Sequence, residues 1–115
     1  MIRIIEQPMK RSELEDIAKN QFGIFIKAAV DIEKEIMAIG GELHADEEAL
    51  LIEQEESKQE HIWGINLYPD KSGEEWIEFN SMINLKPSLG NRTRSIDNPD
   101  IRKKIIKIVA ELIQK

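Results

Sequence analysis

The sequence lacks cysteine, has few aromatic residues and contains no long apolar run, and each absence excludes a class of protein. Without cysteine there is no disulfide framework, no thiolate metal site and no cysteine nucleophile. No apolar stretch approaches the roughly 18 residues that a membrane-spanning helix needs. The N-terminal segment, MIRIIEQPMK, lacks the continuous apolar stretch of a secretory signal. We therefore expect a cytoplasmic protein without a membrane partner.

The composition of the chain is that of a folded domain. Hydrophobic residues make up 41% of the sequence, which is too many for a disordered segment, and charged residues make up 33%, which is too many for a membrane protein. A chain of 115 residues is close to the common length of one domain. We expect a single domain spanning residues 1–115 that folds around its own apolar core.

The two signs of charge are separated along the chain. Residues 31–60 hold 11 acidic and 2 basic side chains, whereas residues 86–115 hold 8 basic and 3 acidic ones. Such asymmetry can mark a nucleic-acid surface, but no nucleic-acid-binding signature is present and aromatic residues are only 5% of the chain. We therefore do not expect a nucleic-acid partner. The two segments can instead complement each other within the fold or across a homodimer.

The N-terminal half alternates between the two periodicities of regular structure. The segments Met1–Ile5 and Ile24–Ile32 alternate apolar and polar side chains, which predicts strands with one buried face. Between them, the apolar spacing from Ser12 onward is helical and stops at Gly23. A further strand is predicted at Ile36–Ile39.

The C-terminal half predicts a hairpin between two helices. Acidic residues at the start of Asp46–Gln54 favour a short helix, with a strand as the alternative for this segment. His61–Tyr68 and Trp76–Leu85 both alternate and are joined by turn residues, which predicts a β-hairpin. Lys86–Asp97 has no period and is expected to be a loop. Asn98 is placed to cap the last helix.

The order of these elements is β-α-β-β-α-β-β-α. It predicts an α+β domain with a mainly antiparallel sheet and with its helices packed on one side of that sheet. The sequence contains neither an internal repeat nor an interdomain linker.

Four stretches of the sequence carry a resemblance: GGELHADEEALLIEQ, WGINLYP, WIEFNSMIN and KPSLGNRTRSIDNPDIR. Through them the chain is similar to a family of short, uncharacterised prokaryotic proteins that is classed as a domain of unknown function. The similarity covers nearly the whole chain, which supports one intact domain. It implies no activity, cofactor or catalytic residue.

One candidate for chemistry is the segment from Glu42 to Asp46. If this segment is extended, Glu42, His44 and Asp46 lie on one side of it, and a distant histidine, His61, adds a fourth metal ligand. The four residues would form the metal centre of a hydrolase or lyase, with Glu78 as the general base. The competing interpretation, which we favour, is that Asp46 caps the following helix and His44 bonds locally.

A second candidate is one face of the predicted hairpin. If Tyr68 lies opposite Trp76, an antiparallel register places Asn66 beside Glu78. The face then presents a set of polar side chains that are uncommon in strands: Asn66, Glu78, Asn80 and Asn84. With two aromatic residues at its edge and a gap at Gly64, opposite Asn80, this surface is suited to bind a small polar ligand. The alternative is an ordinary solvent-facing side of a sheet.

The third candidate is the loop that carries Arg92 and Arg94. Two guanidinium groups shortly before the helix start at Asn98 can bind a phosphate or a carboxylate. The alternative is that both arginines pair with the acidic segment and fix the loop. The sequence contains no Gly-rich phosphate loop, zinc-protease helix, nucleophile elbow or kinase signature.

Our leading hypothesis combines the polar face and the arginine loop in one binding surface. It predicts a noncatalytic protein that binds a small polar or anionic ligand, or a protein partner. The residues expected to bind are Asn66, Tyr68, Glu78, Asn80, Asn84, Arg92 and Arg94. No cofactor is implied. The metal-dependent enzyme and a charge-complementary homodimer are the alternatives, so whether the chain is an enzyme stays open.

Overall fold

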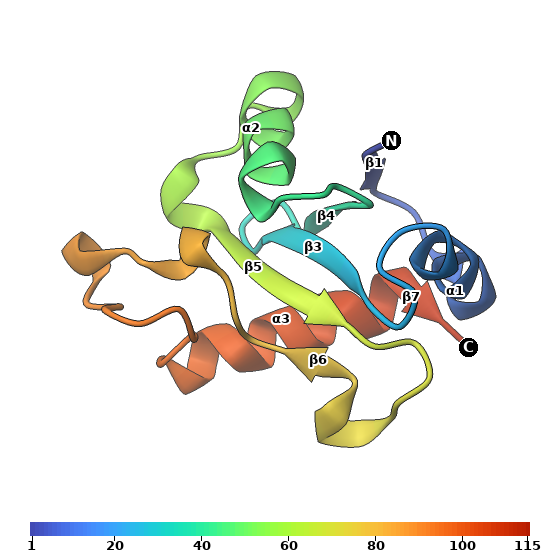
Figure 1. The fold of residues 1–115 in the computed structure, drawn as a ribbon. Helices are drawn as coiled ribbons and strands as arrows, with labels where there is room; N and C mark the ends of the chain where they lie inside the picture. The colour runs from blue at the N-terminus through green and yellow to red at the C-terminus, as the bar shows by residue number, and fades with distance from the viewer.

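The computed structural model describes all residues, 1–115, and shows the α+β fold that the order of elements predicts (Figure 1). Its centre is an antiparallel sheet of five strands. In order across the sheet these are β1 (Arg3–Ile5), β4 (Ile36–Ile39), β3 (Ile26–Asp31), β5 (Ile62–Leu67) and β6 (Ile77–Glu78). The prediction of an antiparallel sheet is thus confirmed.

Three α-helices accompany the sheet: α1 (Arg11–Lys19), α2 (His44–Glu55) and α3 (Pro99–Leu112). Residues 46–54, for which helix and strand were the alternatives, therefore lie in a helix. None of the three helices combines the length and the apolar character required to cross a membrane. The loops contain four short 3₁₀ helices: η1 (Gln59–His61), η2 (Gly73–Glu75), η3 (Met82–Asn84) and η4 (Pro87–Leu89).

The prediction that the helices pack on one side of the sheet is wrong. α1 and α3 pack on one face, where their buried side chains join those of the strands in a core of 19 residues. α2 packs on the opposite face and buries Leu51 against the small side chains of Ala29 and Ala38. In Figure 1, α3 runs behind the strands, whereas α2 lies at the top of the molecule. Successive side chains of β4 point to opposite faces of the sheet, and every residue of β4 is buried. Both faces of the sheet are therefore covered.

The last helix is the element that its own sequence specifies best. As predicted, Asn98 caps it: the side-chain Oδ1 accepts a hydrogen bond from the amide of Asp100 at 2.8 Å, and Pro99 follows in the first turn. The apolar side chains of this helix face the sheet, and the buried ones are Ile105, Ile108, Val109 and Leu112. α3 therefore supplies much of the larger core.

A second, smaller sheet joins segments from the two ends of the chain. β2 (Met9–Lys10) pairs in parallel with β7 (Ile113–Gln114). Met9 and Ile113 are buried and belong to the larger core. The sequence does not predict this pair, because two residues are too few to show a period.

The hairpin between β5 and β6 is shorter than predicted. Its register is the expected one, because Asn66 pairs with Glu78. The amide of Tyr68 also donates to the carbonyl of Trp76 at 2.9 Å. The strand ends at Glu78, however, so the prediction of a strand over Trp76–Leu85 is wrong beyond this residue.

After β6 the chain folds over the sheet instead of continuing along its edge. Ser81 is the N-cap of η3, and its Oγ accepts a hydrogen bond from the amide of Ile83 at 3.2 Å. This turn fills the space beside Gly64, where a Cβ atom would lie 2.5 Å from the Cβ of Ser81. The expected pairing of Gly64 with Asn80, and the expected gap, are therefore absent.

Candidate functional site

A cavity of about 480 Å³ lies on the α2 side of the sheet. This volume is typical of small-molecule sites. The strands contribute Lys27, Asn66 and Glu78 to its lining. The start of α2 contributes residues 43–45, and the segment after β6 contributes residues 80–83. Phe25, Tyr68 and Arg94 complete the lining.

The cavity brings together most of the residues that the sequence predicted for ligand binding. Five of them line it: Asn66, Tyr68, Glu78, Asn80 and Arg94. Arg92 is exposed and does not line the cavity, although it is close in sequence to Arg94. Asn84 is fully buried within η3 and does not line it either. These two residues therefore lie outside the lining of the cavity.

Asn66 has one polar atom without a partner. The residue is 7% exposed, and its Nδ2 donates to Glu78 Oε1 at 2.8 Å and to the carbonyl oxygen of Asn80 at 3.2 Å. Because both partners accept, the amide nitrogen must face them and Oδ1 must point away. This Oδ1 is buried and has no hydrogen-bond partner. Such an atom is costly to leave without a donor.

Glu78 is held through one of its two oxygens. Its Oε1 accepts from Nδ2 of Asn66 at 2.8 Å and from the hydroxyl of Tyr68 at 3.2 Å. No group of the chain donates to Oε2, so this oxygen is free to accept from a ligand. Burial, with the charge of Glu78 added, raises the pKa of Tyr68, so its hydroxyl stays a donor at neutral pH.

His44 is the first residue of α2, and its ring is neutral at pH 7. Its Nε2 lies 2.8 Å from the carbonyl oxygen of Ile65, which only accepts, so Nε2 carries the ring proton. Burial is the main cause that lowers the pKa of His44 below its usual 6.5. The hydrogen bond to Ile65 opposes this shift, whereas the positive charges of Lys27 and Arg94 add to it.

Positive charge and free backbone amides meet in this cavity. Lys27 and Arg94 both line it, together with the start of α2. Leu43 precedes the helix without forming a side-chain cap, and the amides of His44 and Ala45 have no hydrogen bond within the chain. Unpaired amides at a helix start attract anions. The arrangement therefore suits a carboxylate or a phosphate.

The acidic residues in the first turn of α2 do little to oppose an anion. Glu47 is fully buried, and its Oε2 accepts from the amide of Gly41 at 2.9 Å. Burial raises the pKa of Glu47 to about 9, so this side chain is uncharged at pH 7. Asp46 is exposed and does not line the cavity.

Buried asparagines fix the loop that holds Arg94. Nδ2 of Asn91 donates to the carbonyl oxygens of Asn84 and Ser95, both at 2.7 Å. The carbonyl oxygen of Arg94 accepts from the amide of Ser81 at 2.9 Å. Asn84 and Asn91 therefore position the loop and do not offer their side chains to a ligand. Sequence reasoning missed these roles because an alternating pattern does not tell an exposed asparagine from a buried one.

The four predicted metal ligands do not come together. Glu42 is exposed, and His44 and Asp46 lie in the first turn of α2 and not in an extended segment. No three histidine, aspartate or glutamate side chains of the chain form a group that could hold a metal ion. The metal centre predicted at Glu42, His44, Asp46 and His61 is therefore not formed. Asp46 does not cap the helix either, because the helix begins at His44.

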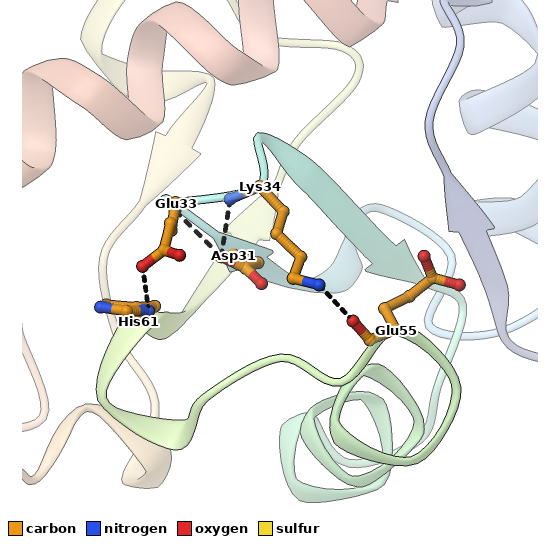
Figure 2. Close-up of polar contacts among 5 residues, drawn as sticks. All are labelled: Asp31, Glu33, Lys34, Glu55 and His61. Atoms are coloured by element: carbon orange, nitrogen blue, oxygen red, sulfur yellow. Dashed lines mark hydrogen bonds and ion pairs between the residues drawn. The ribbon is translucent and has the colours of Figure 1, made fainter.

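His61 lies directly before β5, whereas His44 contacts Ile65 near the other end of that strand. Nδ1 of His61 is 2.9 Å from Oε2 of Glu33, in the turn between β3 and β4 (Figure 2). Asp31 closes this turn, since its Oδ1 accepts from the amide of Glu33 at 2.9 Å. His61 is therefore a neighbour of the turn and not of the cavity.

Comparison with known proteins gives a family and no activity. A family model described as "Protein of unknown function (DUF5674)" matches residues 3–112. No curated protein and no solved structure matches the chain. The matched residues include all those that line the cavity.

Proposed function

The chain belongs to the DUF5674 family of proteins of unknown function, and we propose from the geometry of its cavity that it binds a small anionic ligand that also carries a hydrogen-bond donor. One observation supports this proposal above the others. Lys27, Arg94 and the uncapped start of α2 line the same cavity. Two cationic side chains and free backbone amides are the groups that proteins use for carboxylates and phosphates.

The requirement for a donor comes from Glu78. Glu78 lines the same cavity as the cationic groups, and its Oε2 has no donor within the chain. A hydroxyl or amino group of the ligand would satisfy it. Phe25 and Tyr68, whose ring centroids are 5.5 Å apart, offer apolar contact for the carbon part of the ligand. The ligand class is therefore a hydroxy acid, an amino acid or a small phosphorylated metabolite.

We propose binding and not catalysis. The one serine in the cavity, Ser81, uses its Oγ to accept from the amide of Ile83 and forms no hydrogen bond with His44. An activated nucleophile would need such contact with a base. The metal-dependent alternative has no support, because its ligands are dispersed.

The proposal is tested by titrating the purified chain with sulfate, inorganic phosphate and small hydroxy and amino acids. Calorimetry gives the affinities, and a thermal shift provides a second readout because binding to the native state raises the melting temperature. Sodium chloride of equal ionic strength is the reference. We expect Arg94→Gln to weaken anion binding by about tenfold, since it removes a charged donor from the cavity.

Arg92→Gln is the matched control, because it removes the same charge from the same loop but outside the cavity. This variant should keep its affinity for the anion. An equal loss of affinity in both variants would indicate general electrostatic attraction and contradict the site. A chain that responds to none of the anions more than to chloride would contradict the proposed function.

A further inference from the structure

His44 lies where a positive charge is disfavoured. It is the first residue of α2, so its ring is beside the positive end of the helix dipole. Lys27 of β3 and Arg94 line the same cavity and act on the ring through their charges. The other charged or titratable groups nearby are Glu78 of β6, Tyr68 and, on the segment of His44 itself, Glu42, Asp46 and Glu47.

A protonated ring nevertheless has one acceptor in place and a second polar group in the same cavity. Nε2 of His44 already donates to the carbonyl oxygen of Ile65 at 2.8 Å. Asn66 lines the same cavity and raises the pKa of His44, and its Oδ1 is buried without a hydrogen-bond partner. A proton on His44 would therefore supply the donor that Asn66 lacks. What opposes this proton is the burial of the ring and the two cations beside it.

We propose that anion binding in this cavity is coupled to the uptake of one proton by His44, an inference that rests on the function proposed above. A bound anion neutralises Lys27 and Arg94 and thereby removes their repulsion of the imidazolium. His44 then becomes the third positive charge around the ligand and donates to Oδ1 of Asn66. His44 is thus the residue that determines specificity: the site favours dianions over monocarboxylates and binds them more tightly as the pH falls.

Sulfate is the probe for this inference, because it keeps both of its charges across the pH range in which histidine titrates. Any pH dependence of its binding therefore belongs to the protein. Calorimetry in buffers that differ in ionisation enthalpy gives the number of protons taken up for each sulfate bound. We expect close to one proton per sulfate between the pKa values of free and bound His44. In that window the affinity should fall about tenfold per pH unit as the pH rises.

The chain has two histidines, so each can be followed by NMR and replaced separately. Sulfate should raise the pKa of His44 and leave the ring signals of His61 unchanged. His44→Gln should abolish both the proton uptake and the pH dependence of binding. His61→Gln, which changes the other ring at a distance from the cavity, should preserve both.

The outcomes separate the coupling from the site. Sulfate binding without proton uptake by the unmodified chain would overturn the coupling and leave the anion site intact. A pH dependence that survives in His44→Gln would do the same. The absence of sulfate binding at every pH would overturn the coupling, and the anion site itself would be overturned only if the hydroxy acids, amino acids and phosphate also failed to bind.

Discussion

Asn84 hydrogen-bonds both backbone groups of Gly64: its Oδ1 accepts from the amide at 2.7 Å, and its Nδ2 donates to the carbonyl at 2.9 Å. The strand β6 has already ended at this level of β5, so one side chain replaces the hydrogen bonds of an edge strand. The same Nδ2 donates to the carbonyl oxygen of Arg94 at 3.0 Å. Asn84 therefore ties the sheet to the loop that holds a cation of the cavity.

Asn84→Ala should destabilise the protein by about 3 kcal/mol, because it leaves the amide and carbonyl of Gly64 buried without partners. Urea denaturation followed by tryptophan fluorescence measures this change. Asn80→Ala is the control: Asn80 is exposed, and Asn66 uses only its backbone carbonyl. We expect the free energy of unfolding of Asn80→Ala to differ from that of the unmodified chain by no more than about 0.5 kcal/mol. An equal effect of the two substitutions would contradict the role assigned to Asn84.

The buried carboxyl of Glu47 should make the stability depend on pH. Its pKa in the folded chain is about 9, against 4.5 as its ordinary value. A group whose pKa is raised by folding stabilises the folded chain fully when the pH is below its pKa in the unfolded chain. This stabilisation is lost as the pH rises toward its pKa in the folded chain. As the pH rises from 4.5 to 7, the titration of Glu47 should therefore lower the free energy of unfolding by about 3 kcal/mol. Urea denaturation at several pH values can measure this fall.

Glu47→Gln removes this titration but keeps an oxygen that can accept from the amide of Gly41. The variant should lose most of the fall in stability between acid and neutral pH. Glu53→Gln, on the exposed side of the same helix, should leave the pH dependence as it is. If the free energy of unfolding of Glu47→Gln fell with pH as steeply as that of the unmodified chain, another group would have to be responsible.

Glu56 is strained at the end of α2, because its φ of 56° and ψ of 30° are left-handed. Glycine adopts this conformation without steric cost, so Glu56→Gly should stabilise the chain by about 1 kcal/mol. The same change at Glu53, inside the helix, should destabilise it by about as much. Thermal and urea unfolding of both variants will show whether the two changes in stability have opposite signs. A loss of stability in Glu56→Gly would show that the Glu56 side chain has contacts worth more than the strain.

The parts of the fold that depend on local patterns were predictable. Alternation along β5 separates Trp63, Ile65 and Leu67, which face the larger core, from Asn66, which faces the cavity. The cap at Asn98 is an interaction between neighbours in sequence, so its residue types were sufficient.

The parts that depend on distant packing were not predictable. The side on which α2 packs is decided by the second apolar face of the sheet, which is completed only when β3, β4 and β5 are assembled. Lys27 was overlooked because a lysine that alternates with apolar residues usually faces solvent. The favoured prediction that His44 bonds locally is wrong, because its partner, the Ile65 carbonyl, is 21 residues away and backbone groups leave no mark in a sequence.

The position of α3 after all five strands of the large sheet has a consequence for how the protein is made. All five strands of the large sheet leave the ribosome before the helix that covers one of its faces. Until Ile105, Ile108 and Leu112 have emerged, only α1 covers that face, and the apolar side chains that pack against α3 are exposed to water. Exposed apolar surface of this kind promotes aggregation of nascent chains. A ribosome stalled before residue 99 should therefore carry a chain that chaperones retain, and synthesis through α3 should release it.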